Sequence, residues 1–500
     1  MKKKLLAILT MTALMSLASC TNSGTPGGEG GGGGDPVGPG GDDTITIKYT
    51  NSWGKDYQST LDALLEDFMK ANPKIKVEEI KAGGYDGIHT QTKSDLNTGT
   101  GDWGDLVICY PDHVVDYIDY GMAVNLETLM DDPEIGWTAE EKEDMIAGFM
   151  AEGSQFPVEG TYCLPYVKST EALFYNEDVI IGLDLSKIDA TINGGSPLNK
   201  DYIDNLTWEE FFNKLCPAIA AYNDSLDAAH KILIDGGETA INGICGYDST
   251  ANLFINLCEQ YGVGYSSVDQ DTGKGSIDFN NDNTKELMKL FNKAALEGYL
   301  QPSTRLNNNS YCSSYFVAQN LLFNIGSTAG ASHEVSSNFE VGVAPIPGAT
   351  GGNKHVISQG PSLCILSHPE GGKELRTKRI QAAWELYKFM TSTERAAEWA
   401  ITVNYLPVRT SSLSTDDYLD HASTAGKTPR SSDLLSAKTC QYSTDASNNV
   451  FTSAVFKGSS VARTQVGALM SDILLADHEL SDAELKTLFD TVYGNIIKEM

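Results

Sequence analysis

Beyond its first twenty residues, the chain has no apolar run that approaches the roughly 20 residues needed to cross a bilayer. The rest of the chain is therefore expected to contain no membrane-spanning helix. Basic residues are also scarce, because 36 Lys and Arg stand against 67 Asp and Glu, for a net charge of −31 at pH 7. Since so acidic a surface repels nucleic acid and anionic lipid head groups, the composition argues against both as partners.

The nine cysteines include no CxxC pair and no Cys/His spacing typical of zinc sites. Cys20 follows the apolar run at the start of the chain. The other eight cysteines are widely spaced and mostly lie in apolar segments, as Cys109 and Cys364 do. An even number of thiols outside the cytoplasm permits disulfides, whereas apolar surroundings favour buried free thiols. Both alternatives stay open, and no metal or cofactor is expected.

The chain begins with a short basic and apolar leader. Three lysines at positions 2–4 precede the apolar run 5–17, which has the charge and length of a secretory signal peptide. The run ends in Leu-Ala-Ser-Cys20, which resembles the bacterial lipobox, where the cysteine becomes the lipid-modified first residue. A plain signal peptide followed by an unrelated cysteine is the alternative. We expect a lipoprotein signal peptide over residues 1–19 and a lipid on Cys20.

Residues 20–43 form a Gly-, Pro- and Ser-rich segment without large apolar side chains. Such a composition cannot bury enough surface to fold. A Gly-rich coil of this length spans about 25 to 30 Å. We therefore expect a disordered tether that holds a folded protein at the cell envelope, on the periplasmic or extracellular face of a membrane.

From residue 44 onward, strand and helix patterns alternate. The segments 44–49, 74–81 and 105–110 read as strands, while 56–71 and 85–97 carry apolar residues at helical spacing. This order predicts parallel pairing with helices covering the sheet. In open sheets of this kind ligands bind at the carboxyl ends of strands, where Trp53 and Tyr110 fall.

Three Thr/Ser-x-x-Glu capping boxes predict further helix starts at Thr138, Thr207 and Ser481. The last of these precedes a terminal helix with one apolar face, formed by Leu485, Leu488, Phe489, Val492 and Ile496. We interpret this face as a packing surface.

Several later stretches together resemble a known family. They are 160–176 (GTYCLPYVKSTEALFYN), 205–212 (NLTWEEFF), 339–348 (FEVGVAPIPG) with Gly360, the helix 382–390 and 404–409 (NYLPVR). Their order and spacing are similar to those of the family 1 extracellular solute-binding proteins, from about residue 44 to the C-terminus. The resemblance implies an α/β, two-lobe periplasmic-binding-protein-like fold of type II. Each lobe would be a mostly parallel sheet flanked by helices, with the ligand in the cleft between the lobes.

By this resemblance, lobe one comprises 44–156 plus 345–392, and lobe two comprises 157–344 plus 393–500. The family implies capture of a small molecule without catalysis, closure of the lobes and delivery to the permease of an ABC importer. A monomer is expected, with membrane contact through the lipid anchor only. A tether suits this task because it raises the effective concentration of the receptor at its permease.

The candidate ligand-binding residues favour a carbohydrate. Sugars are held by aromatic faces and by planar polar side chains, although each aromatic here has the alternative of packing in a core. The full candidate set is Trp53, Tyr85, Tyr110, Asp112, Tyr166, Lys168, Ser169, Tyr247, Asp248, Ser327, Gly360, Tyr405 and Arg463.

A narrower resemblance points to a phosphate ligand. The layout of Gly83-Gly-Tyr85, 168–170, 326–328, Gly360, Tyr405 and 461–463 is similar to that of glycerol-3-phosphate and glycerophosphodiester binders of the same family. It implies that Arg463 holds a phosphate bidentately and that Lys168 adds a point charge. However, 246–252 has no tryptophan where those proteins use one, and Tyr110-Pro-Asp112 replaces their Tyr-Glu. A neutral sugar therefore ranks ahead of the glycerol phosphates.

Catalytic motifs give no support to an enzyme. There is no GxSxG and no HExxH, and Pro429 blocks the helix that a P-loop at Gly426-Lys-Thr428 would need. Paired carboxylates for glycoside hydrolysis cannot be located among 67 acids. A secreted glycosidase and a surface adhesin lipoprotein are the alternatives from other classes. The segment 269–278 lacks key calcium-loop residues and is interpreted as a polar turn between strands.

Overall fold

The computed structural model describes residues 44–99, 101–269, 271–306, 311–447 and 449–500. The expected signal peptide, Cys20 and the tether lie outside these residues. Within the described ranges, no helix combines the length and apolar character needed to cross a membrane. The same ranges contain no group of three or more His, Cys, Asp or Glu side chains placed to hold a metal ion.

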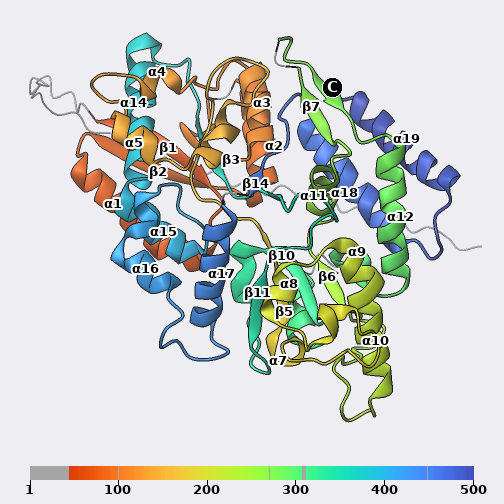
Figure 1. Cartoon of the computed structure of the whole chain (residues 1–500). Coiled ribbons are helices and arrows are strands. Elements are labelled where there is room, and N and C mark those ends of the chain that lie inside the picture. Colours follow the sequence, from red (N-terminus) through yellow and green to blue (C-terminus); the bar gives the residue numbers. More distant parts are fainter. Residues whose placement is uncertain (1–43, 100, 270, 307–310, 448) are drawn as a thin grey trace, which may run out of the picture. The chain divides into compact units, whose positions relative to one another are not determined.

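The first of two five-stranded sheets has the strand order β2-β1-β3-β13-β4, and Figure 1 labels its strands β1, β2 and β3. Its strands are β1 (Ile45–Asn51), β2 (Ile75–Lys81), β3 (Leu106–Cys109), β4 (Leu164–Pro165) and β13 (Ser362–Ile365). Strand β1 pairs in parallel with β2 and β3, whereas β13 is antiparallel to β3 and β4. Helices α1 (Gln58–Ala71) and α2 (Gly84–Thr98) connect the first three strands. The predicted order of elements and its parallel pairing are confirmed.

The second sheet has the order β11-β5-β10-β6-β9. Its strands are β5 (Glu171–Asn176), β6 (Cys245–Tyr247), β9 (Leu300–Pro302), β10 (Phe323–Ser327) and β11 (Val341–Ala344). Strand β6 is parallel to β9 and β10, while β5 is antiparallel to β10 and β11. Each sheet is therefore mixed, where the resemblance implied a mostly parallel one. The antiparallel strands β5 and β13 follow segments that leave the other sheet, so they enter without a βαβ crossover.

Two small strand pairs complete the β structure. Strands β12 (Val356–Ile357) and β14 (Val450–Phe451) are parallel. Strands β7 (Ser266–Val268) and β8 (Gly275–Ile277) form an antiparallel hairpin. The segment 269–278, which the sequence predicts as a turn between strands, therefore includes β8.

Helices pack against both sheets (Figure 1). Helices α1, α2 and α14 (Gly372–Met390) contact the first sheet, and α15 (Thr393–Val403) packs on α1 and α14. Helix α18 (Ser459–Leu475) contacts β9 and packs against α11 (Thr250–Tyr261), α12 (Asp282–Leu296) and α19 (Asp482–Ile497). The other helices are α3 (Pro111–Asp119), α4 (Glu127–Met130), α5 (Ala139–Asp144), α6 (Ala147–Met150), α7 (Glu177–Ile180), α8 (Lys200–Asp204), α9 (Trp208–Glu210), α10 (Cys216–Ser225), α13 (Ser313–Val317), α16 (Asp416–Ala422) and α17 (Ser432–Ala446).

The predicted helix starts are present. Thr138 at α5 and Ser481 at α19 form complete capping boxes with the glutamate three residues later. Thr207 accepts the backbone N–H of Glu210 at the start of α9. The predicted apolar face of α19 is buried apart from half-buried Leu488.

All eight cysteines of the described residues are buried and unpaired. Of the two alternatives left by the sequence, the structure therefore has free thiols. Burial raises the pKa of the Cys216 and Cys258 thiols, so both stay protonated at neutral pH and are poor nucleophiles.

The chain crosses between the sheets at residues 166–170, which join β4 to β5, and at 345–361, which join β11 to β13. The crossing segments are hydrogen-bonded side by side. Ser169 and Gln359 exchange two backbone hydrogen bonds, of 2.9 and 2.8 Å, and Lys168 exchanges two with Leu406, of 3.0 and 2.6 Å. A paired set of crossing segments is the place where a hinge can bend.

The exact lobe boundaries remain a prediction. Two segments assigned to lobe two contribute to the core of the first sheet, namely Tyr162–Val167, which includes β4, and residues of 399–408. Their apolar side chains pack with Trp53 and Leu363 because β4 pairs with β13 before the chain crosses to the second sheet.

Candidate ligand-binding pocket

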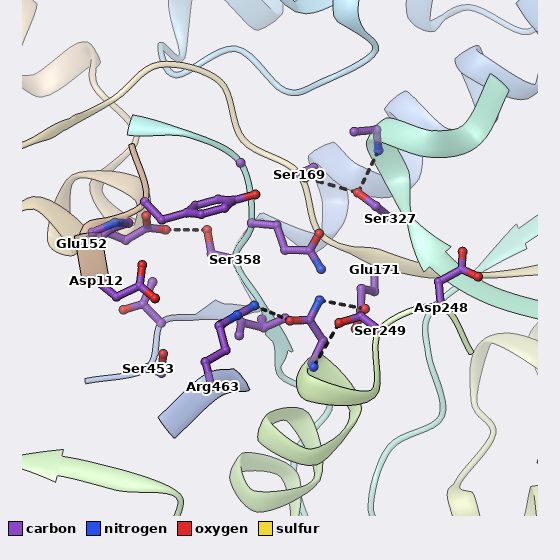
Figure 2. Close-up of a pocket in the computed structure, with 18 of the residues that line it drawn as sticks. Asp112, Glu152, Ser169, Glu171, Asp248, Ser249, Ser327, Ser358, Ser453 and Arg463 are labelled. Atoms are coloured by element: carbon purple, nitrogen blue, oxygen red, sulfur yellow. Dashed lines mark hydrogen bonds between the residues drawn. The ribbon is translucent and has the colours of Figure 1, made fainter. Parts of the chain in front are cut away.

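A cavity of about 510 Å³ is lined by residues that follow strands of both sheets (Figure 2). Tyr110 and Asp112 follow β3 of the first sheet, whereas Asp248 follows β6 and Ser327 ends β10 of the second. The cavity has the size of a typical small-molecule site. Of the two residues expected near a ligand at the carboxyl ends of strands, Tyr110 after β3 lines the cavity and Trp53 after β1 does not.

Eight of the thirteen candidate residues line this cavity, which brings together segments up to 353 positions apart in the chain. They are Tyr110, Asp112, Ser169, Asp248, Ser327, Gly360, Tyr405 and Arg463. Their contact with a ligand stays a prediction.

Three candidate aromatics lie behind the wall of the cavity. Trp53 and Tyr166 are buried in the first core, with ring centroids 6.1 Å apart, and Trp53 also stands edge-on to Tyr405 at 6.2 Å. The half-buried Tyr85 packs on Tyr110, with ring centroids 4.7 Å apart. These rings therefore support the lining tyrosines Tyr110 and Tyr405 and are not lining residues themselves.

Lys168 and Tyr247 also lie outside the lining, because buried carboxylates engage their polar atoms. Lys168 is 0% exposed, forms an ion pair with Glu152 and donates to the carbonyl of Gly360 (3.2 Å) and to Ser362 Oγ (3.3 Å). The Lys168 ammonium group, which the narrower resemblance assigned to a phosphate, is therefore paired with a carboxylate inside the protein. Tyr247 donates its hydroxyl to Glu171 Oε2 at 2.7 Å.

A buried carboxylate, Glu171, organises one wall of the cavity. Glu171 Oε1 accepts from Asn252 Nδ2 (3.0 Å), and Glu171 Oε2 accepts from Asn256 Nδ2 (2.8 Å). Arg463 donates to Asn252 Oδ1, so the guanidinium reaches Glu171 through the amide, as the dashed lines in Figure 2 show. Burial raises the pKa of Glu171 to about 7, although these hydrogen bonds and the charge of Arg463 oppose the shift.

A second acidic group lies on the wall formed by the second sheet. Asp248 Oδ1 accepts the backbone N–H of Cys312 at 2.7 Å, and Glu334 Oε1 accepts from Asn324 Nδ2 at 2.7 Å. Burial raises the pKa of Asp248 to about 6. Burial and then the charge of Asp248 raise the pKa of Glu334 well above its ordinary value.

Sequence reasoning missed several lining residues, including Glu152, Gln155, Glu171, Asn252, Tyr265, Glu334, Ser358 and Gln359. Two of them carried a signal. Glu171 is the first residue of the fully buried strand β5, and Asn252 lies on the largely buried helix α11. A polar residue in a fully buried element must find a partner, and that partner is often at a site. Ser358 and Gln359 lie in a crossing segment whose pattern gives no such signal.

The fold has two helix-flanked sheets that are joined by paired crossing segments, and residues of both sheets line one cavity. This arrangement is typical of a two-domain ligand-binding protein. The family model described as bacterial extracellular solute-binding protein matches residues 63–425. The chain therefore belongs to this family, whose members serve ABC transporters outside the cytoplasm. No curated protein sequence matches the chain.

Solved structures similar to this chain have the same fold. UgpB from Mycobacterium tuberculosis in complex with glycerophosphocholine is 17% identical, with a TM-score of 0.65 over 91% of this chain and 98% of that one. Lmo0181 from Listeria monocytogenes in complex with cycloalternan is 16% identical, with a TM-score of 0.63 over 91% and 98%. The GacH receptor of Streptomyces glaucescens, solved unliganded and with acarbose, is 16% identical, with a TM-score of 0.62 over 91% and 99%.

Proposed function

We propose that the protein is a lipid-anchored receptor that captures a carbohydrate and delivers it to the permease of an ABC importer. Binding involves no chemistry. Ligand contacts to residues of both sheets stabilise a closed form, and the permease recognises that form. The tether from Cys20 keeps the receptor close to its permease.

The observation that carries the carbohydrate proposal is the composition of the cavity wall. Tyr110, Tyr265, Tyr311 and Tyr405 supply aromatic surface, and serine hydroxyls, Asn252 and two glutamines supply hydrogen-bonding groups. Stacking faces combined with planar polar groups suit the apolar C–H surface and the hydroxyls of a sugar. The neighbours crystallised with cycloalternan and with acarbose are consistent with this ligand class.

A glycerol phosphate or glycerophosphodiester is the second candidate. It is favoured by Arg463, which lines the cavity, and by the similarity to a glycerophosphocholine-binding protein. Against it, Arg463 already contacts Asn252, Lys168 is paired with Glu152, and five carboxyl side chains share the wall. An anionic ligand would face this negative charge, so the carbohydrate ranks first.

Ligand titration by calorimetry tests the proposal on the full chain as its host cell processes it. We expect heat of binding with one of a panel of mono- and oligosaccharides, and none with glycerol-3-phosphate or glycerophosphocholine. Binding of the glycerol phosphates alone would reverse the ranking. Turnover of chromogenic glycosides, measured in parallel, would instead support the secreted glycosidase.

Tyr405→Ala should weaken ligand binding by about five- to thirtyfold, because loss of an aromatic ring that contacts a ligand costs roughly 1–2 kcal/mol. The stability of the unliganded protein should change little, since Tyr405 is only half buried. Tyr493→Ala, at a partly exposed site on α19 outside the cavity, is the matched control. If Tyr405→Ala unfolds the protein, Tyr405 is a core residue and its assignment to the site is wrong.

The anchor is tested separately. A clickable fatty acid fed to cells that express the chain should label the wild-type protein, and Cys20→Ser should lose the label and release the protein from the membrane fraction. Unchanged labelling of Cys20→Ser would refute the assignment of Cys20.

A further inference from the structure

The wall formed by the second sheet holds two carboxyl groups that face the same glycine. A Cβ added to Gly326 of β10 would lie 2.7 Å from Asp248 Oδ2 and 3.5 Å from Glu334 Oε1. Because Gly326 has no side chain, nothing from this position separates the two acids. Asp248 and Glu334 both line the cavity.

Part of this pair has no protein partner. Glu334 is only 3% exposed, and its Oε2 accepts no hydrogen bond from any residue that the structure describes. The same holds for Oδ1 of Asn324, whose Nδ2 donates to Glu334 Oε1. A buried acceptor without a partner costs free energy, so a donor supplied by a ligand would be favourable here.

The charge of the wall decides which kind of donor fits. Among the described lining residues, Asp112, Glu152, Glu171, Asp248 and Glu334 are acids, against the guanidinium of Arg463 and the imidazole of His333. Lys168 neutralises Glu152 from behind, and Arg463 reaches Glu171 through Asn252. No lysine or arginine of the described residues forms an ion pair with Asp248 or Glu334, and the only described basic side chain of the lining next to them in the chain is His333. Burial raises the pKa of both carboxyls and so disfavours their charged forms. An ammonium group donates hydrogen bonds and also favours the ionised form of the two carboxyls, whereas a ligand hydroxyl brings no such charge.

We propose that Asp248 and Glu334 bind a protonated amino group of the ligand, so that the carbohydrate captured by this protein is an amino sugar or an oligosaccharide that contains one. The inference rests on the proposed function and specifies its substrate class. The two carboxyl groups receive the ammonium hydrogens, while Tyr110 and Tyr405, which pack on Tyr85 and Trp53, contact the sugar ring. The net charge of −31 further attracts a cationic ligand toward the protein.

Calorimetric titration at pH 7 compares chitosan tetrasaccharide, which carries free amines, with its fully N-acetylated counterpart and with maltotetraose. The full chain is used in its processed form. We expect the free-amine tetrasaccharide to bind at least about tenfold more tightly than the N-acetylated one, as a charge-assisted hydrogen bond requires. Equal affinity, or a preference for a neutral sugar, would overturn the inference and leave the carbohydrate proposal in place.

Two nearly isosteric variants test whether Asp248 and Glu334 cause the preference for the free-amine tetrasaccharide. Glu334→Gln and Asp248→Asn should each reduce the preference for the free amine by about tenfold and leave the affinity for the N-acetylated form nearly unchanged. Glu238→Gln, which removes an exposed acid outside the cavity, is the matched control and should keep the preference. If one variant fails to fold, the other still decides, and a preference that survives the substitution overturns the assignment to this pair.

Spermidine separates the inference from the proposed function. Binding of spermidine without binding of any sugar would support the amine site and refute the carbohydrate receptor. If neither amines nor sugars bind, both proposals are wrong.

Discussion

Lys168 illustrates how the meaning of a single side chain depends on its partner. In the sequence it stands in the motif Lys-Ser-Thr and resembles a ligand-binding cation. In the structure Glu152, sixteen positions earlier, supplies a buried counter-charge, and the pair lies beneath the crossing segments where Lys168 also bonds to Gly360 and Ser362. Glu152 in turn accepts the Ser358 hydroxyl at 2.6 Å (Figure 2). The ion pair therefore ties three segments together at the proposed hinge.

Lys168→Met should lower the free energy of unfolding by about 3–5 kcal/mol, because it leaves the charge of Glu152 buried without a counter-ion. The double variant Lys168→Met/Glu152→Gln should lose less than Lys168→Met alone, since it removes that charge. Urea unfolding followed by tryptophan fluorescence measures both. Lys457→Met, at an exposed site, is the control. If Lys168→Met lowers the free energy of unfolding no more than Lys457→Met does, the ion pair between Lys168 and Glu152 is not buried from solvent.

The regular elements were predictable where their pattern is local. The spacing of apolar residues predicts β1, α1, β2 and α2 to within about two residues, because each of these elements buries one face more than the other, and the continuous apolar run of β3 predicts a strand that is buried on both faces. The mixed pairing of the sheets was not predictable, since it depends on which strands meet after the chain crosses. The partners of Tyr247 and Lys168 could not be predicted for the same reason. The carboxylates that bind them, Glu171 and Glu152, come from other segments of the chain, so the sequence shows both side chains as available to a ligand.

The capping box of α19 makes the contribution of one such local signal measurable. Ser481 Oγ accepts the backbone N–H of Glu484, and the Glu484 carboxylate accepts the N–H of Ser481 at 2.9 Å. Ser481→Ala removes the cap and should lower the free energy of unfolding by about 1 kcal/mol. Thr491→Ala, at an exposed position further along the same helix, should be neutral or slightly stabilising because alanine is the better helix former. Urea unfolding of the two variants side by side checks the difference, and equal effects would mean that the cap is dispensable.

The whole molecule combines a strongly acidic composition with a cavity that concentrates buried carboxyl groups. Glu171, Asp248 and Glu334 all have pKa values raised by burial. Each of these carboxyls therefore keeps its proton to a higher pH in the folded protein than in the unfolded chain. A binding protein accepts this cost in stability where the buried acids serve the ligand, as we propose for Asp248 and Glu334.

This arrangement fixes the sign of one pH dependence. The carboxyl of Glu171 loses its proton near pH 4.5 in the unfolded chain but near pH 7 in the folded protein. Between these values the folded protein binds more protons, so the contribution of Glu171 to stability is complete below pH 4.5 and is lost as the pH rises through 7. The shift corresponds to about 3 kcal/mol.

Glu171→Gln removes the titrating group at this position. Because Asp248 and Glu334 titrate in both proteins, the difference between wild type and Glu171→Gln reports the titration of Glu171 alone. The unfolding free energy of wild type relative to Glu171→Gln should therefore fall as the pH rises from 5 to 8 and level off above it. Urea unfolding of both proteins at intervals across this range measures the difference. If the unfolding free energies of the two proteins change in parallel with pH, Glu171 is already ionised in the folded protein, with Arg463 acting through Asn252 as its counter-charge. If the difference between them falls as the pH rises, burial outweighs the charge of Arg463 in setting the pKa of Glu171.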